Sequence, residues 1–392
     1  MPTAAELAGR YRVVRALTER LRAPLSAEDC QAQSMPDASP AKWHLAHTTW
    51  FFETFVLEPG RSGYRPFAPA YRVLFNSYYQ GVGAQHPRAQ RGLLTRPSLD
   101  EVIAYRAHVD GHLLDWLAGD DARVAALAPV IEIGLHHEQQ HQELLLTDAK
   151  HLLGANPLAP AYAALPPAPD MAAPPLAWRS VDGGTREIGA GPGGFAFDNE
   201  RPRHAVLVEP FAVASRPTTN AEYAAFIADG GYRRPELWLA DGWAAVQQHG
   251  WTAPLYWRDE GRAFGLHGEH PRRPDEPVLN LSFYEAAAYA EWAGARLPTE
   301  FEWEAAAALA APPAQCFGVA WQWTRSSYDP YPRYRPWAGA VGEYNGKFMV
   351  GQIVLRGSSL ATPPGHARLT YRNFFPPAAR WQFSGLRLAR DL

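Results

Sequence analysis

The Ala- and Pro-rich stretch at residues 154–177 constrains the fold more than any other feature of this 392-residue chain. Before it, apolar residues recur at the three- and four-residue spacing of amphipathic helices. After it, Gly, Pro, Trp and Tyr become frequent, and helical spacing survives in patches such as 219–228 and 283–294. A stretch of this composition is typical of a linker. The sequence therefore predicts two domains, 1–153 and 178–392, in a chain too long for one ordinary core.

Residues 5–153 are predicted to be mostly helical. One amphipathic face is formed by Leu7, Tyr11, Val14, Leu17 and Leu21. Further helical runs cover 102–117 and 125–153, and Ser39 followed by Pro40 predicts another helix start, with Ser39 as the cap. Helices of this number and length predict a four-helix bundle, whose facing side chains commonly build metal sites.

The part after the linker predicts a compact α+β domain with short strands and long functional loops. The whole chain is thus expected to be a multidomain α and α+β protein. Its hydrophobic content of 47% is ample for burial. The formal net charge of -3, with no long stretch of one sign, argues against a nucleic acid or an anionic membrane surface as partner.

Cysteine usage and the N-terminus indicate the compartment. Cys30 and Cys316 are the only cysteines and lie far apart, which argues against a disulfide framework and a Cys-based zinc site. Residues 1–22 carry charges throughout and lack the apolar centre of a signal peptide. No membrane span is expected elsewhere. A cytoplasmic enzyme is the simplest prediction.

The sharpest local signal is the segment 135–143, which reads LHHEQQHQE inside the longest helical run. Histidines four positions apart lie on one face of a helix, close enough to share a metal ion. His137 and His141 meet this condition. His136 points about 100° away around the helix, as a supporting or surface group would, and His151 lies roughly 15 Å farther along.

A third ligand is expected from the segment 43–50, which reads WHLAHTTW. His47 is the better candidate because it lies beside Trp50 on the apolar, inward face, whereas His44 lies near Lys42 at the helix start. The alternative role for any of these histidines is that of a packed, hydrogen-bonded core residue.

Three neutral imidazoles with open coordination positions suit zinc, iron, copper or nickel, so the ligand set alone leaves the metal open. The spacing of His137, Glu138 and His141 also matches the zinc-hydrolase motif, in which Glu138 would be the general base. Against this alternative, no suitable His or Glu follows at the spacings where zinc proteases carry their third ligand.

A long irregular connection is expected at residues 74–97, and loops of this length are usually functional. Tyr78 or Tyr79 offers a phenol that can donate a proton to a reacting oxygen species. Aromatic packing is the alternative for one of the two. Arg88 and Arg91 are suited to bidentate binding of a carboxylate, with ordinary surface charge as the alternative.

Several motifs in order closely resemble the sulfoxide synthases of ergothioneine biosynthesis, and the resemblance covers nearly the whole chain. The motifs are QSMPDASPAKWHLAH at 33–47, NSYY at 76–79, HEQQH at 137–141, NERPRH at 199–204, RLPTE at 296–300, YRNFFP at 371–376 and GLRLAR at 385–390.

This resemblance implies a DinB-like bundle followed by a domain of the formylglycine-generating-enzyme type, related to C-type lectin folds. It implies Fe(II) as the metal and O2 as the co-substrate. The implied reaction joins a chalcogen to C2 of the imidazole of hercynine, the trimethylated betaine of histidine. Carried over by position, the iron ligands are His47, His137 and His141, and the catalytic phenol is Tyr78 or Tyr79.

The resemblance also implies substrate contacts. The betaine pocket is formed by Gln140, Asn373, Phe374 and Phe375. The two phenylalanine rings can face a quaternary ammonium by cation–π attraction, with core packing as the alternative for one of them. Arg88 and Arg91 match positions that bind the carboxylate of the thiol donor.

The second domain alone is compatible with two other kinds of function. A formylglycine-generating enzyme relies on cysteines, and Cys316 is the only cysteine there. A lectin-like binding module suits the second domain in isolation, but it leaves the histidines of the first domain unexplained.

Two segments depart from the sulfur enzymes. Where LRGGSCATP is expected, the chain reads LRGSSLATP at 355–363, and LNLS at 279–282 replaces CHVS. Because these segments are expected to line or support the pocket, the departures favour a different donor, a selenosugar, as in selenoneine synthase. The retained Arg88 and Arg91 favour the alternative, cysteine or γ-glutamylcysteine, since a neutral sugar offers them no carboxylate.

Overall fold

The structure is a computed structural model that describes residues 2–119, 122–164 and 173–392. The chain forms two compact units. The first comprises Met1–Ala164 with Trp337–Tyr344, and the second comprises Leu165–Pro336 with Asn345–Leu392.

The segment Trp337–Tyr344 is the main difference from the expected division, because it belongs to the first unit although it comes late in the chain. Its contacts with the first unit are described below with the site. The expected linker, 154–177, overlaps the last two residues of helix α7, which ends at Ala155, and stops before strand β1 begins at Trp178. Its central part, 165–172, lies outside the described residues.

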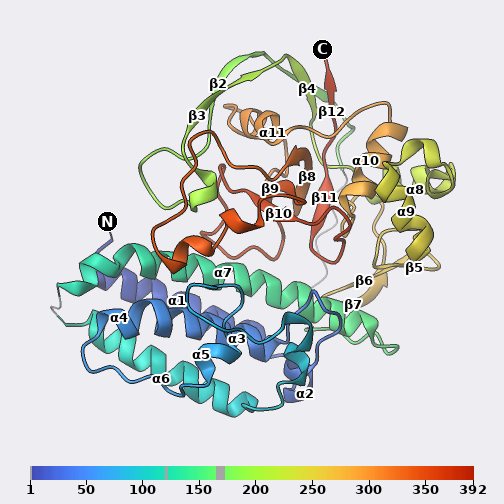
Figure 1. Cartoon of the computed structure of the whole chain (residues 1–392). Coiled ribbons are helices and arrows are strands. Elements are labelled where there is room, and N and C mark those ends of the chain that lie inside the picture. The colour runs from blue at the N-terminus through green and yellow to red at the C-terminus, as the bar shows by residue number, and fades with distance from the viewer. Residues whose placement is uncertain (1, 120–121, 165–172) are drawn as a thin grey trace. The chain divides into compact units, whose positions relative to one another are not determined.

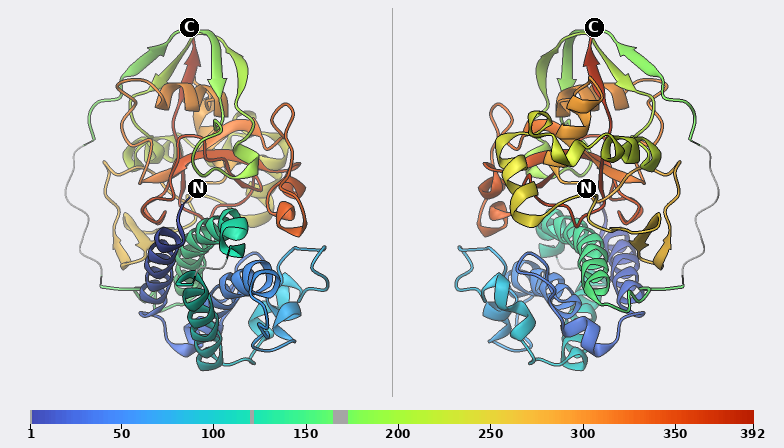
Figure 2. Two further views of the ribbon diagram at one scale, coloured as in Figure 1. Left: turned by 90° about the vertical axis from the view of Figure 1, so that its left-hand side faces the viewer. Right: turned by 90° about the vertical axis from the view of Figure 1, so that its right-hand side faces the viewer.

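The first unit is helical (Figure 1). Its α-helices are α1 (Ala4–Arg22), α2 (Ala27–Gln31), α3 (Ala41–Phe52), α4 (Glu58–Gly60), α5 (Tyr71–Leu74), α6 (Leu99–Leu117) and α7 (Arg123–Ala155). A π-helical turn, η1 (Glu53–Leu57), continues α3, and 3-10 turns η2 (Arg88–Leu93) and η6 (Ala340–Glu343) lie in the connecting segments. The long helices α1, α3, α6 and α7 pack along one another (Figure 2), and the predicted bundle is confirmed.

Helix α3 is the centre of the bundle, because each of its residues from Ala41 to Phe52 is buried. The predicted start of this helix is wrong in one respect. Pro40 occupies the cap position, and no side chain caps the helix. The hydroxyl of Ser39 does not cap the helix. Its backbone N–H instead donates to the Asp148 carboxylate of α7 at 2.8 Å.

Most other long helices begin with a capping box, in which a Ser or Thr hydroxyl and a carboxylate three residues later satisfy each other's backbone N–H groups. These pairs are Thr3 and Glu6, Ser98 and Glu101, Thr219 and Glu222, Ser282 and Glu285, and Thr299 and Glu302. The helices predicted from apolar spacing near 219–228 and 283–294 are present as α8 (Asn220–Ala228) and α10 (Phe283–Trp292).

The second unit combines short strands with helices and loops, as predicted. Its helices are α8 (Asn220–Ala228), α9 (Ala240–His249), α10 (Phe283–Trp292) and α11 (Glu300–Ala307), with 3-10 turns η3 (Asp198–Glu200), η4 (Gly231–Arg233), η5 (Pro235–Leu237) and η7 (Gly346–Phe348). Its strands are β1 (Trp178–Val181), β2 (Gly184–Ile188), β3 (His204–Val208), β4 (Phe211–Ala214), β5 (Trp257–Arg258), β6 (Arg262–Gly265), β7 (Gly268–Pro271), β8 (Ala320–Ser327), β9 (Ile353–Ser358), β10 (Asn373–Phe375), β11 (Ser384–Leu386) and β12 (Ala389–Asp391).

These strands form small sheets with the orders β1-β4-β12, β10-β9-β8-β11, β2-β3 and β5-β6-β7. Strand β11 pairs with β8 in parallel, and the other pairs are antiparallel. Strand β12, at the C-terminus, lies beside β4 (Figure 2). Apolar side chains from β1, β3, β4, α11 and β12 bury one core cluster.

Candidate metal centre

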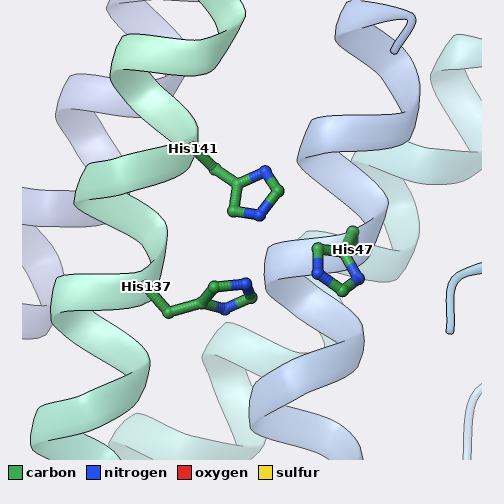
Figure 3. A group of neighbouring side chains, drawn as sticks. All are labelled: His47, His137 and His141. Carbon is green, nitrogen blue, oxygen red and sulfur yellow. The ribbon is translucent and has the colours of Figure 1, made fainter. Parts of the chain in front are cut away.

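His47 on α3 and His137 and His141 on α7 converge in the first unit (Figure 3). One potential ligand atom from each ring lies within 4.8 Å of the other two. His137 and His141 project from successive turns of α7 toward His47. The i, i+4 spacing on one helix and a single histidine on the facing helix therefore create a three-sided nitrogen site.

The close approach of α3 and α7 depends on Gly134, one turn before His137. A Cβ atom at this position would lie 2.6 Å from the ring of Phe52 and 3.0 Å from the ring of Phe51. Both rings are fully buried and have little room to move. A residue without a side chain thus allows α3 to lie close enough for His47 to meet the α7 histidines.

Burial favours the neutral form of all three rings. Burial lowers the pKa of His137 to about 3, and burial followed by the neighbouring histidines lowers the pKa values of His47 and His141 well below their usual range. The Nδ1–H of His47 donates to the Phe75 carbonyl at 2.7 Å, which leaves Nε2 with its lone pair. Neutral imidazole is the form that binds metals.

The residues fit a metal ion. Among the described residues, neither His47 Nε2 nor either ring nitrogen of His137 has a hydrogen-bond partner, although all are buried. Buried polar atoms are normally satisfied, and a bound ion is one of the standard explanations when no protein partner is present. Three imidazoles suit iron, zinc, copper or nickel and leave positions for substrates.

Glu138 faces away from this cluster. Its carboxylate accepts hydrogen bonds from Arg15 at 3.0 Å, Arg106 at 3.1 Å and Thr18 at 2.7 Å. Burial alone would raise the pKa of Glu138, but the two guanidinium charges outweigh it and lower the pKa to about 2. A carboxylate held in this way joins α1, α6 and α7 and cannot serve as the general base of a zinc hydrolase.

The remaining histidines of these segments have different surroundings. His136 is buried rather than on the surface, with Arg10 Nη2 at 3.4 Å from its Nε2. His151 Nδ1 lies 2.7 Å from the Ser34 hydroxyl, away from the cluster. His44, which the sequence placed at a polar helix start, is buried, and its Nδ1 lies 2.8 Å from Nδ1 of His141.

Tyr78 and Tyr79 lie in the first unit, in a turn fixed by Asn76. The Asn76 amide donates to the Tyr79 carbonyl at 3.0 Å and accepts from the Tyr79 N–H at 3.1 Å. Tyr79 is fully buried against Trp50 and Phe55, and burial raises the pKa of its hydroxyl well above the usual range. Tyr78 is half-buried, with its ring 4.7 Å from that of Tyr79.

The structure adds a third phenol that the sequence did not indicate. Tyr344, at the end of the segment Trp337–Tyr344, is buried with its ring centroid 5.5 Å from that of His137. Its hydroxyl donates to the side-chain oxygen of Gln140, and its ring lies 6.4 Å from that of Tyr78. Gln140 and Tyr344 are thus paired beside the histidine cluster.

Glu343 anchors this segment. Its carboxylate accepts from the backbone N–H of Gln80 at 2.9 Å and from that of Gly81 at 2.6 Å. A Cβ on Gly81 would lie 3.0 Å from the same carboxylate and 3.3 Å from the Ala340 side chain. The tyrosine turn and Tyr344 are therefore held together by one charged side chain and one small residue.

The two predicted carboxylate-binding arginines differ in environment. Arg88 is exposed and donates to the Asp37 carbonyl. Arg91 is buried, donates to the hydroxyls of Ser39 and Ser77 at 2.9 Å each, and covers the Trp43 ring at 3.4 Å. Burial lowers the pKa of Arg91 to about 9.

Asn373, Phe374 and Phe375 form β10 of the second unit, and their role in the betaine pocket stays a prediction. Phe374 stacks on Tyr328 at 4.0 Å with an angle of 11°, and Phe375 meets Trp381 edge-on at 6.0 Å. All three residues of β10 are half-buried.

The departing segments also lie in the second unit. Leu360 follows β9 and is 50% exposed. Asn280 is buried in the left-handed region at φ 63°, which asparagine tolerates well, and its amide donates to the carbonyls of Trp381 and Gln382. Cys316, whose thiol donates to the Pro313 carbonyl, is buried.

Comparisons with known proteins agree with this organisation. A sequence model of the DinB superfamily matches residues 10–145, and one of the sulfatase-modifying factor enzyme 1-like domain matches residues 167–312. The chain is 35% identical to the hercynine oxygenase of Mycobacterium tuberculosis, with all of both chains covered. The chain belongs to the hercynine oxygenase family. The predicted membership in the sulfoxide synthases of ergothioneine biosynthesis is confirmed, and so is the predicted fold class.

Other relatives match either the whole chain or only part of it. The hercynine oxygenase of Mycolicibacterium thermoresistibile is 34% identical, covering 100% of this chain and 96% of that protein. The formylglycine-generating enzyme of Streptomyces coelicolor is 36% identical, but the aligned region covers only 29% of this chain and 41% of that enzyme. Within the described residues, no helix is both long and apolar enough to cross a membrane.

Proposed function

We propose that this chain is an Fe(II)- and O2-dependent oxidoreductase that forms a C–Se or C–S bond at C2 of the imidazole of hercynine. The observation that carries the proposal is the cluster of His47, His137 and His141 in a chain that matches hercynine oxygenases over its full length. Fe(II), when bound by these histidines, supplies the activation of O2 and a point at which both substrates are held together.

The proposed reaction balances without a further reductant. Hercynine loses the hydrogen on C2, and the donor loses the hydrogen of its selenol or thiol. One oxygen atom of O2 ends on the chalcogen and the other in water. Two electrons leave the substrates when the new bond forms and two more when the chalcogen is oxidised, so that O2 takes up all four.

Protein groups beside the cluster suit this chemistry. The Tyr344 hydroxyl lies near His137 and donates a hydrogen bond to Gln140. It can therefore deliver a proton during reduction of O2. We assign Gln140, Asn373, Phe374 and Phe375 to hercynine, because an amide can bond the imidazole and aromatic faces attract a trimethylammonium group. Tyr78 is the second candidate for the proton donor, and the buried ring of Tyr79 packs against it.

The donor we favour is a selenosugar, with cysteine or γ-glutamylcysteine as the alternative. The retained Arg88 and Arg91 are the argument for a carboxylate on the donor. However, Arg91 stacks on Trp43 and binds Ser39 and Ser77, so it has a structural task whichever donor is used. Together with the departures at 279–282 and 355–363, this favours the selenium donor.

The test is a competition between 1-selenoglucose, cysteine and γ-glutamylcysteine. The purified chain would be reconstituted with Fe(II) under nitrogen and then given hercynine, O2 and the three donors together. Mass spectrometry should find a C2-substituted hercynine carrying selenium as the main product. A main product carrying sulfur would overturn the donor assignment, and the absence of any C2-substituted product with all donors would overturn the proposed function.

Two controls make the result specific. Replacing His137 with alanine should remove both the bound iron and the product, because it deletes one of three ligands. The variant His151→Ala changes a histidine of the same helix outside the cluster and should keep both. Zinc in place of iron should give no product, whereas a zinc hydrolase would retain its activity.

A further inference from the structure

His44 connects the ligand His141 to a buried carboxylate. Its Nδ1 lies 2.8 Å from Nδ1 of His141, and its Nε2 lies 3.0 Å from Oδ2 of Asp148. His44 and Asp148 are only 3% and 7% exposed, so water does not compete with these contacts. Asp148, His44 and His141 thus form a continuous buried chain that ends at the metal centre.

The hydrogen-bonded series Asp148, His44 and His141 has only one arrangement of hydrogens in which His141 can bind a metal. If His141 offers the lone pair of Nε2, its neutral ring carries a hydrogen on Nδ1. Nδ1 of His44 must then accept this hydrogen, and a neutral His44 carries its own hydrogen on Nε2, pointing to Asp148. The opposite direction would put a hydrogen on Nε2 of His141 and block its lone pair.

Asp148 is placed to fix this direction. A carboxylate only accepts hydrogen bonds, so Nε2 of His44 must donate. The same oxygen of Asp148 also accepts the backbone N–H of Ser39 at 2.8 Å, just before helix α3 begins. Asp148 is therefore held between α7 and the start of α3, the two helices that carry the histidine cluster.

The other two histidines of the cluster are supported differently. His47 donates to a neutral backbone carbonyl, that of Phe75. His137 makes no hydrogen bond through either ring nitrogen among the described residues. A ligand whose second ring nitrogen donates into a hydrogen-bonded chain, as His141 does through His44 to Asp148, is better oriented than one without such a partner. The site is thus asymmetric in the support that each ligand receives.

We propose that His44 and Asp148 are positioning residues that hold His141 in the tautomer with hydrogen on Nδ1 and aim its Nε2 at the metal. This inference rests on the metal site of the proposed function, but not on the identity of either substrate. It assigns a role to His44 and Asp148, two residues that make no contact with the ion themselves.

The test measures cobalt(II) binding by the full chain, by competition with a coloured chelator, together with the ligand-field absorption of the bound ion. The variant His44→Phe keeps a ring of similar size but cannot accept from His141. It should bind Co(II) about 10- to 100-fold more weakly than the wild type, and the absorption bands should shift. Asp148→Ala should lose a similar factor, and Asp148→Asn, which keeps an acceptor, should lose less.

His151→Phe is the matched control on α7 and should leave affinity and spectrum unchanged. If His44→Phe fails to fold, the graded series Asp148→Asn and Asp148→Ala decides. Co(II) affinity within twofold of the wild type and an unchanged spectrum in the folded variants would overturn the role of His44 and Asp148 alone. A wild-type chain that binds no divalent metal would overturn the proposed metal centre itself.

Discussion

The indole of Trp43 lies nearly parallel to the imidazole of His47, with ring centroids 4.5 Å apart and planes inclined by 15°. The Trp50 ring is also nearly parallel to that of His47, with centroids 5.6 Å apart, and the guanidinium of Arg91 lies over the Trp43 ring. Trp43 and Trp50 lie one turn before and one turn after His47 on α3. The ring of His47, which we propose as a metal ligand, is therefore packed against two indoles of its own helix.

Replacing Trp43 with alanine is expected to weaken metal binding as well as the fold. Loss of a buried indole costs about 3–5 kcal/mol in the free energy of unfolding. Freeing the His47 ring to sample other rotamers adds a cost of about 1 kcal/mol on binding, or roughly fivefold in Co(II) affinity. Chemical denaturation and chelator competition measure the two effects separately.

Trp116→Ala is the control for this prediction. Trp116 is similarly buried and lies in α6, a helix that carries none of the three clustered histidines. This variant should lose comparable stability and keep the wild-type affinity for Co(II). Equal affinity in Trp43→Ala and Trp116→Ala would show that stacking does not hold His47.

Glu138→Gln is expected to lower the stability of the fold and to leave metal binding unchanged. The substitution removes the anion that Arg15 and Arg106 share, and each guanidinium keeps a second carboxylate, Asp110 or Glu19. The loss should therefore cost about 1–3 kcal/mol in the free energy of unfolding. The variant should still bind Co(II) with unchanged ligand-field bands, because Glu138 faces away from the histidines. Denaturation of the metal-free chain, followed by metal titration of the folded variant, checks both points.

The surface pair Arg10 and Glu132 provides the comparison, since Glu132→Gln should cost no more than about 1 kcal/mol. A hydrolase that used Glu138 as its general base would behave in the opposite way. It would lose peptide hydrolysis in Glu138→Gln while keeping most of its stability.

The three phenols near the cluster should separate on substitution by phenylalanine. Tyr344→Phe is expected to lower kcat by about 100-fold, because it removes the hydroxyl that points at Gln140 beside His137. Tyr78→Phe should have a smaller effect, and Tyr79→Phe should keep turnover, since Tyr79 is enclosed by Trp50 and Phe55. Steady-state product formation and bound iron are measured for each variant, and a larger loss of kcat in Tyr78→Phe or Tyr79→Phe would contradict the assignment.

The sequence was sufficient for features that depend on local spacing. His137 and His141 follow from the helix period, and His47 follows from the apolar neighbours on α3. It was misleading where tertiary contacts override local polarity. Its place beside Lys42 at the helix start counted against His44, yet Lys42 is buried and its ammonium donates to the carbonyls of Leu94 and Pro97 at 2.8 Å each. The same burial makes His44 part of the site.

Tyr344 could not be found from spacing at all. It belongs to the first unit because Glu343 binds the N–H groups of Gln80 and Gly81, a contact between segments far apart in the chain. Neither the carboxylate nor the glycine forms a local pattern with the histidines. The functional role of the tyrosine loop stays a prediction, and the segment that packs against it could be identified only from the fold.

Lys150 gives the chain a pH-dependent stability that can be measured without substrates. It is buried in α7, and burial lowers its pKa to about 7. In the unfolded chain the pKa of lysine is about 10.4. Between these values the unfolded chain binds more protons than the folded one, so the free energy of unfolding should rise with pH from about 7 toward 10.

Lys150→Met should remove this dependence, because methionine fills a similar volume without a charge to bury. The variant should be more stable than the wild type at pH 7 and below, where the folded wild type carries the buried charge, and the two should converge as the pH approaches 10. Lys347→Met, which changes an exposed lysine, should leave the slope intact. Thermal melting of the metal-free proteins from pH 6 to 9.5 tests this, and an identical slope in Lys150→Met and the wild type would mean that Lys150 does not deprotonate in the folded chain.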